Sequence, residues 1–247
     1  MCMLMALKTD ETTMGPNELL RIQAEFKGVQ NQIVNNTGAT LVCPFSQARE
    51  PMLSFCKRYS NTRGGICEAI VARWIGDHAN DVSLWDELLS YTTRGGEATY
   101  DININVINEI TTQQHLGGLF NQDQLTYTSE YLRGRNVVAR EYHASSHLGH
   151  PLGSAYAVGN SLVQIVNARR NNVGGIYAMF TVMRDDAGGH VMGAFIGSRG
   201  NDVAFFDPNY GDFWFERRLA FDRFFPDFIH NYYNAYNTYD VRTFVRA

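Results

Sequence analysis

A cysteine at the start of an apolar segment is the strongest candidate nucleophile in this chain. Cys67 follows two glycines, and Ile70, Val71 and Trp74 after it recur at helical spacing. This spacing predicts a helix over 67–79 that begins at the cysteine. A thiol in the first turn of a helix lies near unpaired backbone N–H groups and the positive end of the helix dipole, and both favour the reactive thiolate. The alternative is an inert cysteine packed in the core.

A histidine and an aspartate lie at one end of a predicted β-hairpin. Two apolar runs, the first starting at His190 and the second ending at Asp207, are joined by a short loop that contains Gly and Asn. The register follows if Gly197 pairs with Asp202. His190 then lies opposite Asn209, and Asp207 is a diagonal neighbour on the same face, roughly 7–8 Å away between Cα atoms. A slip of one residue would turn Asp207 to the other face, so the pair depends on this register.

Together these residues supply the parts of a cysteine-hydrolase site. A Cys–His couple needs a base within hydrogen-bond reach of the sulfur and a third group that holds the imidazole. Cys67, His190 and Asp207 supply a nucleophile, a base and an orienting acid. A histidine and a carboxylate at the end of a hairpin can also form a purely structural pair. The pattern therefore favours catalysis only when all three residues are taken together.

Short motifs surround these three residues. They are Gly64-Gly65-Ile66-Cys67 with Ala69 and Trp74-Ile75, Gly189-His190, and Phe206-Asp207-Pro208-Asn209-Tyr210-Gly211. Together they resemble the motifs of the YopT/AvrPphB cysteine proteases, which are bacterial effectors with a papain-like fold. The resemblance implies that Cys67 is the nucleophile, His190 the base and Asp207 the orienting acid. The papain-like pattern also has an amide side chain a few residues before the nucleophile as an oxyanion donor, and Asn61 stands at that place.

The elements that must position these residues indicate an α+β layout, with a helical half packed on a mostly antiparallel sheet. We expect an N-terminal extension over 1–45, partly mobile, followed by a papain-like catalytic domain over 46–247, with a substrate cleft between the two halves. The expected helices span 17–34, 67–79, 83–90, 102–115, 121–132, 154–169 and 217–236. The expected strands span 137–143, 175–184, 190–197, 202–207, 212–216 and 239–245.

Charge and hydropathy narrow the range of partners. The net charge is −4, without a basic block, which argues against binding to nucleic acid. No apolar run reaches the length of about 18 residues that would span a bilayer. The first eight residues lack the basic region of a secretory signal, and export by a specialised secretion machine would leave no such signal. We expect a monomer without a transmembrane segment.

The remaining candidate sites have simpler interpretations. Cysteines at positions 2, 43, 56 and 67 need not form a disulfide framework in a chain of 247 residues, so we expect reduced thiols. His143, His147 and His150 would share a helix face and could hold a metal, but serines, a glycine and Pro151 disfavour a helix there. We expect neither a metal nor another cofactor. The aromatic residues between 221 and 233 recur at helical spacing, which favours a core over a lipid- or peptide-binding face.

The resulting hypothesis is a papain-like cysteine endopeptidase that cleaves host proteins after delivery into the host cell as a bacterial effector. The family resemblance implies a host signalling protein as substrate, either a lipid-anchored GTPase or a kinase. An acyltransferase, transglutaminase or deamidase could use the same three residues on another acceptor. A non-catalytic binding module on the same fold is the second alternative, although it would not require all three residues.

The Asn61→Ala substitution tests the expected oxyanion donor. We expect kcat to fall by roughly 10²-fold with KM nearly unchanged, because the hydrogen bond strengthens only as the carbonyl oxygen becomes negative. Alkylation of the Cys67 thiol should stay close to that of the unaltered protein. A raised KM with unchanged kcat would instead make Asn61 a substrate-binding residue.

Overall fold

The protein is built around one seven-stranded antiparallel sheet, in the order β1-β8-β7-β6-β5-β9-β4. The computed structural model describes residues 16–58, 60–62, 65–94, 97–119, 124–144, 159–160, 163, 175–184, 188–198, 202–236 and 238–247. The strands are β1 (Thr40–Cys43), β4 (Val137–Ala144), β5 (Ile176–Arg184), β6 (Gly188–Ile196), β7 (Val203–Asp207), β8 (Gly211–Phe215) and β9 (Thr238–Arg246).

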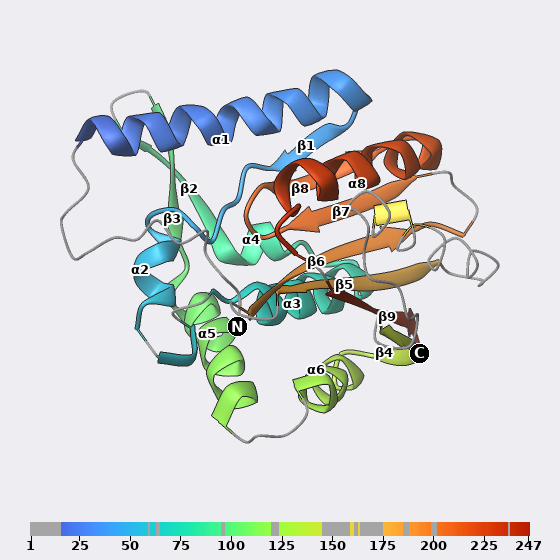
Figure 1. Ribbon diagram of the computed structural model, residues 1–247. Coiled ribbons are helices and arrows are strands. Elements are labelled where there is room, and N and C mark those ends of the chain that lie inside the picture. The colour runs from blue at the N-terminus through green and yellow to red at the C-terminus, as the bar shows by residue number, and fades with distance from the viewer. Residues whose placement is uncertain are drawn as a thin grey trace.

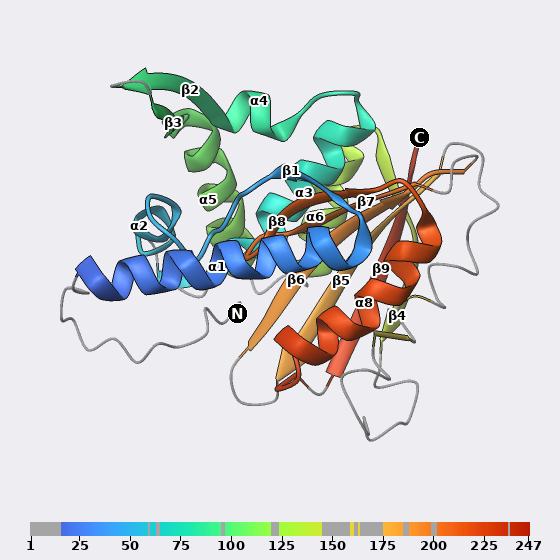
Figure 2. The same cartoon turned by 90° about the horizontal axis from the view of Figure 1, so that it is seen from above.

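Helices cover both faces of this sheet (Figures 1 and 2). One face carries α1 (Pro16–Thr37) and α8 (Arg218–Tyr232), and the other carries α3 (Cys67–Ala79), α5 (Ile104–Leu119) and α6 (Gln124–Arg133). The shorter elements are α2 (Met52–Cys56), the 3-10 helix η1 (Ser60–Thr62), α4 (Leu84–Leu88) and a separate hairpin of β2 (Leu89–Arg94) and β3 (Glu97–Ile102). The predicted α+β class with a mostly antiparallel sheet is confirmed.

Side chains that alternate along the strands pack into two apolar cores, one on each face of the sheet. On the α8 face, the ring of Phe205 contacts four phenylalanine rings of α8 at centroid distances of 5.5–5.9 Å. These four rings, Phe221, Phe224, Phe225 and Phe228, are buried. The prediction that this aromatic stripe belongs to the core is therefore confirmed. On the α3 face, Ile70, Val71 and Trp74 pack against Val191 and Phe206 of the sheet.

A glycine in β6 allows α3 to lie close against the sheet. A Cβ atom at Gly193 would stand 2.9 Å from Cγ1 of Val71 and 3.2 Å from the ring of Trp74. A side chain at this position would push the helix away, so the glycine sets the spacing between the two halves. Further along both elements, the rings of His78 and Phe195 lie 4.7 Å apart. Helix α3 and strand β6 therefore run in the same direction.

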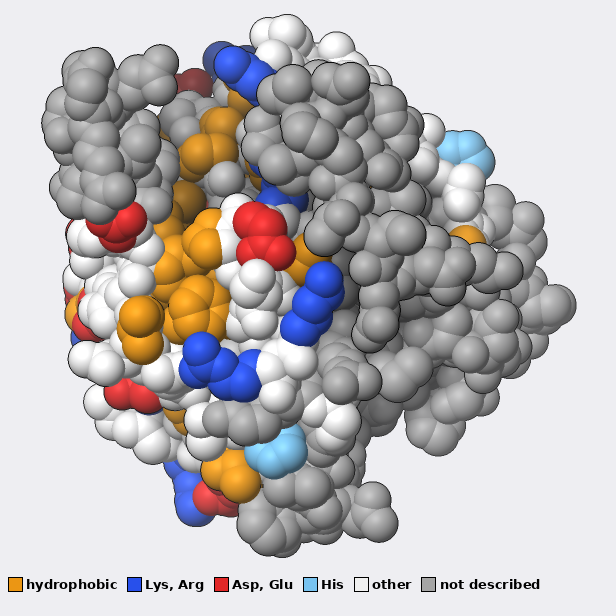
Figure 3. Space-filling model, turned by 90° about the vertical axis from the view of Figure 1, so that its left-hand side faces the viewer, with side chains coloured by type: hydrophobic (Ala, Val, Ile, Leu, Met, Phe, Trp, Pro, Cys, Tyr) orange, Lys and Arg blue, Asp and Glu red, His pale blue; other side chains and the backbone are white. Residues whose placement is uncertain are grey.

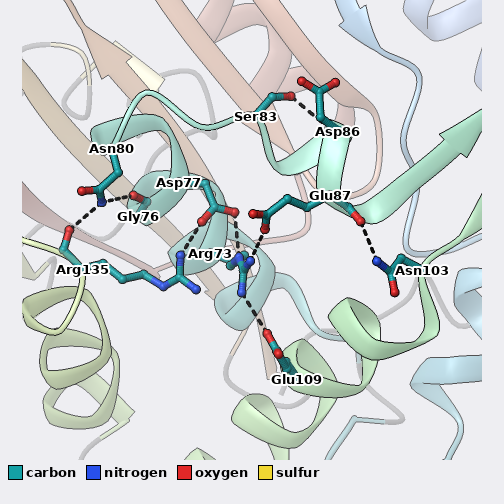
Figure 4. A network of polar contacts seen from close by, with 10 residues as sticks. All are labelled: Arg73, Gly76, Asp77, Asn80, Ser83, Asp86, Glu87, Asn103, Glu109 and Arg135. Atoms are coloured by element: carbon teal, nitrogen blue, oxygen red, sulfur yellow. Dashed lines mark hydrogen bonds and ion pairs between the residues drawn. The ribbon is translucent and has the colours of Figure 1, made fainter.

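A buried arginine ties α3 to its helical neighbours (Figure 4). Arg73 donates to Oδ2 of Asp77 at 2.7 Å and to Oε2 of Glu109 at 3.0 Å, and it also pairs with Glu87. Arg135 pairs with the other oxygen of Asp77. Since Glu87 belongs to α4 and Glu109 to α5, one guanidinium fixes α3 against two helices. A charge buried this deeply needs such partners, because removing one would leave an uncompensated ion.

Most of the expected elements are present, and α3 has the predicted bounds of 67–79. The sequence-based prediction missed β1, α2 and the β2–β3 hairpin. The β2–β3 hairpin lies between the helices expected over 83–90 and 102–115, where Tyr- and Thr-containing segments suit a pleated sheet. The helix expected over 154–169 lies outside the described residues except at 159, 160 and 163, which are helical. His147 and His150 also lie outside them.

The division into an extension over 1–45 and a catalytic domain over 46–247 stays a prediction. Within the described part of the chain, β1 pairs with β8 of the large sheet. Ile33 of α1 belongs to the same apolar core as the phenylalanines of α8. No described helix combines the length and the apolar character needed to cross a membrane. Among the described residues, no three His, Cys, Asp or Glu side chains gather as a metal site would require.

Candidate active site

Cys67 is the first residue of α3, as the sequence predicts. The chain reaches it through Gly65, whose φ of +113° is a conformation that only glycine adopts easily. The N–H of Gly65 donates to the carbonyl of Thr62 at 2.8 Å, and the buried hydroxyl of Thr62 donates to the carbonyl of Cys56 at 2.6 Å. These bonds fix the entry into α3, so the position of Cys67 is set by the loop as well as by the helix.

Two glutamines satisfy backbone donors around the first turn of α3. The N–H of Ile66, the residue before Cys67, donates to Oε1 of Gln47 at 2.8 Å. The N–H of Ala69 donates to Oε1 of Gln114 at 3.1 Å. Ile66 itself offers no side-chain cap. Donors at a helix start need acceptors when they are buried, and here the acceptors come from distant parts of the chain.

Two other cysteines of the described part of the chain are unreactive thiols. Cys43 and Cys56 are free and buried, and burial raises the pKa of each thiol to about 12. The thiolate is the nucleophilic form, so neither residue is a candidate nucleophile at neutral pH. The expectation of reduced thiols is confirmed for these two residues and stays a prediction for Cys67.

The hairpin register that the candidate His–Asp pair depends on is confirmed. Strand β6 pairs with β7 through Gly193 and Phe206 up to Ile196 and Val203, the register that follows from pairing Gly197 with Asp202. The ladder covers four pairs and stops before the residues of interest. At this end, side chains join the two strands: Nε2 of His190 lies 2.9 Å from Oδ1 of Asp207, and both residues are fully buried.

Asp207 accepts two further hydrogen bonds. The N–H of Asn209 donates to Oδ1 at 2.7 Å, and the hydroxyl of Tyr233 donates to Oδ2 at 2.7 Å. The ring of Tyr233 also stacks on His190, with centroids 5.0 Å apart and planes 10° from parallel. Burial raises the pKa of Tyr233 well above its usual value, with the charge of Asp207 adding to the effect, so its hydroxyl stays a donor. Sequence reasoning missed Tyr233, because nothing local marks a tyrosine after α8 as a partner of the hairpin.

Cys67 begins α3 and His190 is the third residue of β6, and these two elements run side by side. Both elements meet at Gly193, as described above. From that contact, Cys67 lies about 6–10 Å back along α3 and His190 about 10 Å back along β6, at the usual rise per residue of each element. The start of α3 is therefore level with the start of β6, at the end of the sheet where Asp207 lies.

The fourth candidate is only partly described. Asn61 belongs to η1, the 3-10 helix that ends three residues before Gly65. Its side chain lies outside the described part of the structure, so its role as an oxyanion donor stays a prediction. The neighbouring Thr62 is fully buried, which fixes the backbone beside it.

Comparisons with known proteins give a family match over most of the chain. The family model Peptidase_C58, described as Yersinia/Haemophilus virulence surface antigen, matches residues 24–245. Cysteine protease yopT1 of Yersinia enterocolitica is 28% identical over 198 residues, which are 78% of this chain and 59% of that protein. Cysteine protease YopT of Yersinia pestis is 27% identical over 197 residues, with the same coverage of 78% and 59%. The chain thus spans about three-fifths of the length of these relatives.

A solved structure also matches. The crystal structure of the Pseudomonas avirulence protein AvrPphB is 16% identical in sequence, with a TM-score of 0.49. The match covers 75% of this chain and 94% of that one.

The thiols should differ sharply in reactivity. After reduction, iodoacetamide should label Cys67 much faster than Cys43 or Cys56, because burial keeps the latter two protonated at neutral pH. Mass spectrometry of the proteolysed protein gives the three rates. Equal rates after reduction would remove Cys67 as the activated thiol.

Proposed function

Because this chain belongs to the Peptidase_C58 family, described as Yersinia/Haemophilus virulence surface antigen, we propose that it is a cysteine endopeptidase that uses Cys67, His190 and Asp207. One observation carries the proposal beyond family membership. A fully buried His190–Asp207 pair lies at the end of the sheet, level with a cysteine that starts the helix packed across it. A structural His–Asp pair alone would not need this cysteine at the same end.

The hydrogen bond between Nε2 and Asp207 determines which nitrogen of His190 would act as the base. Nε2 is bonded to Asp207, so in the neutral imidazole this nitrogen carries the proton and Nδ1 is the basic one. Nδ1 would then take the proton from the reduced thiol of Cys67. Asp207 cannot turn away from the imidazole, because Asn209 and Tyr233 hold both of its oxygens. This arrangement fixes the tautomer, which is the function of the third residue in such a site.

The proposed reaction follows from these roles. The thiolate of Cys67 attacks a peptide carbonyl, and the protonated imidazole gives its proton to the leaving amine, which leaves a thioester on the cysteine. Water, deprotonated by His190, then releases the acyl product. The backbone N–H of Cys67 and the side chain of Asn61 would stabilise the oxyanion, with each donor contributing roughly 3 kcal/mol in the transition state.

We propose host proteins as substrates, reached after delivery of the protein from a bacterium into the host cell. The two Yersinia relatives are named cysteine proteases, which supports proteolysis as the reaction class. The side of the molecule on the left of Figure 1, where β7 ends, carries hydrophobic side chains next to basic and acidic ones (Figure 3). A mixed surface of this kind suits an extended protein segment. A lipid-anchored GTPase and a kinase both remain candidate substrates, and the monomeric state stays a prediction.

Host-cell lysate treated with the reduced protein tests this function. We expect new protein N-termini in that sample and none in a lysate treated with the Cys67→Ala variant, because only the thiolate can form the acyl intermediate. Mass spectrometry of N-terminal peptides would identify both the substrate and the cleavage site.

Two results would contradict proteolysis. A mass shift on glutamine residues without new N-termini would indicate deamidation, and addition of an amine there would indicate transglutamination. If no lysate protein changes in a way that depends on Cys67, a non-catalytic binding module would be favoured.

A further inference from the structure

A buried glutamine links the two halves of the candidate site. Gln47 lies between β1 and α2, far in sequence from all three proposed catalytic residues, and its exposed fraction is 3%. Its side-chain oxygen accepts from the N–H of Ile66 at 2.8 Å, directly before Cys67. Its side-chain nitrogen donates to Oδ1 of Asn209 at 3.0 Å, in the turn that follows Asp207. The backbone N–H of Gln47 donates to the carbonyl of Pro208 in the same turn at 2.7 Å.

The direction of these hydrogen bonds is fixed by chemistry. The N–H of Ile66 can only donate, so the oxygen of the Gln47 amide must face it and the nitrogen must face Asn209. The amide oxygen of Asn209 is thereby used, and its nitrogen points to the hydroxyl of Tyr233 at a long 3.4 Å. That hydroxyl donates in turn to Asp207. A single polarised series of bonds thus runs from the start of α3 to the orienting carboxylate.

The geometry points to Gln47 as a positioning residue that sets the start of α3, and with it Cys67, against the turn that holds the Asp207–His190 pair. This inference rests on the proposed function. The helix and the hairpin belong to different halves of the fold, and apolar packing alone tolerates small slides between them. Directional hydrogen bonds do not, since they weaken steeply with distance and angle. A displacement of about 1 Å between reacting groups can cost 10²-fold in rate.

A second glutamine offers a matched control. Gln30 of α1 is buried to the same 3%, and its side-chain nitrogen donates to the carbonyl of Tyr210 at 2.8 Å. Both glutamines therefore hold the turn after Asp207. Only Gln47 also bonds to the residue before Cys67. Replacing each by methionine keeps similar volume and removes the hydrogen bonds, so the two variants separate support of the turn from alignment of α3.

The experiment measures alkylation of reduced Cys67 by iodoacetamide across a pH series, together with the thermal midpoint of unfolding. We expect Gln47→Met to slow alkylation at neutral pH by about 10- to 100-fold and to move the midpoint of the pH profile upward, because the displaced thiolate loses its imidazolium partner. Gln47→Met and Gln30→Met should lower the thermal midpoint of unfolding by similar amounts. Gln30→Met should nevertheless leave the alkylation profile close to that of the unaltered protein. Gln47→Glu, which keeps the acceptor for Ile66, should fall between them.

The same experiment can overturn the inference. An unchanged profile in Gln47→Met, or equal losses of alkylation rate in Gln47→Met and Gln30→Met, would reduce Gln47 to structural support. If Gln47→Met does not fold, a wild-type profile in Gln47→Glu would refute alignment through Asn209. Failure of the proposed function would be recognised by another measurement. The unaltered protein would then cleave no substrate, whatever its alkylation profile.

Discussion

The buried carboxylate of Asp207 needs hydrogen-bond partners, and this need determines which side chains gather at this end of the sheet. Asp207 is fully buried, and an ionised carboxylate without partners there would cost several kcal/mol. It meets this requirement with Nε2 of His190, the N–H of Asn209 and the hydroxyl of Tyr233. Each hydrogen bond to a charged group contributes about 1.5–3 kcal/mol, so three of them can offset the cost of desolvation. The groups that stabilise the carboxylate are thus also the groups that hold the imidazole.

The hydrogen bonds around Asp207 continue to the helical half of the fold through the turn after β7. The backbone N–H of Asn209 donates to Asp207, and the side-chain oxygen of Asn209 accepts from Gln47. Gln47 in turn accepts from the N–H of Ile66 at the start of α3. The close approach of α3 to β6 at Gly193 sets the distance between the halves, and the glutamine sets their offset. The apolar cores supply most of the stability, and the polar bonds add direction to the placement of α3 relative to the hairpin.

Local sequence patterns predicted the parts of the site that depend on neighbours along the chain. Helical spacing after Cys67 predicted α3, and the apolar runs with their Gly/Asn loop predicted the register that brings His190 to Asp207. Tyr233 and Gln47 could not be found in this way, because their partners lie far along the chain and no periodicity marks them. Strand β1 is short and at the edge of the sheet, so it leaves a weak pattern.

The tautomer of His190 tests most directly whether Cys67, His190 and Asp207 form one unit. Nitrogen chemical shifts of the imidazole, assigned with a His190→Gln variant, show which nitrogen carries a proton. In Cys67→Ala, we expect the neutral imidazole to carry its proton on Nε2, because that nitrogen donates to Asp207. In the reduced protein, the chemical shift of Nδ1 should differ from that in Cys67→Ala, because the proposed couple places the Cys67 sulfur against Nδ1. A proton on Nδ1 in Cys67→Ala, or identical Nδ1 shifts in the two proteins, would contradict a catalytic couple.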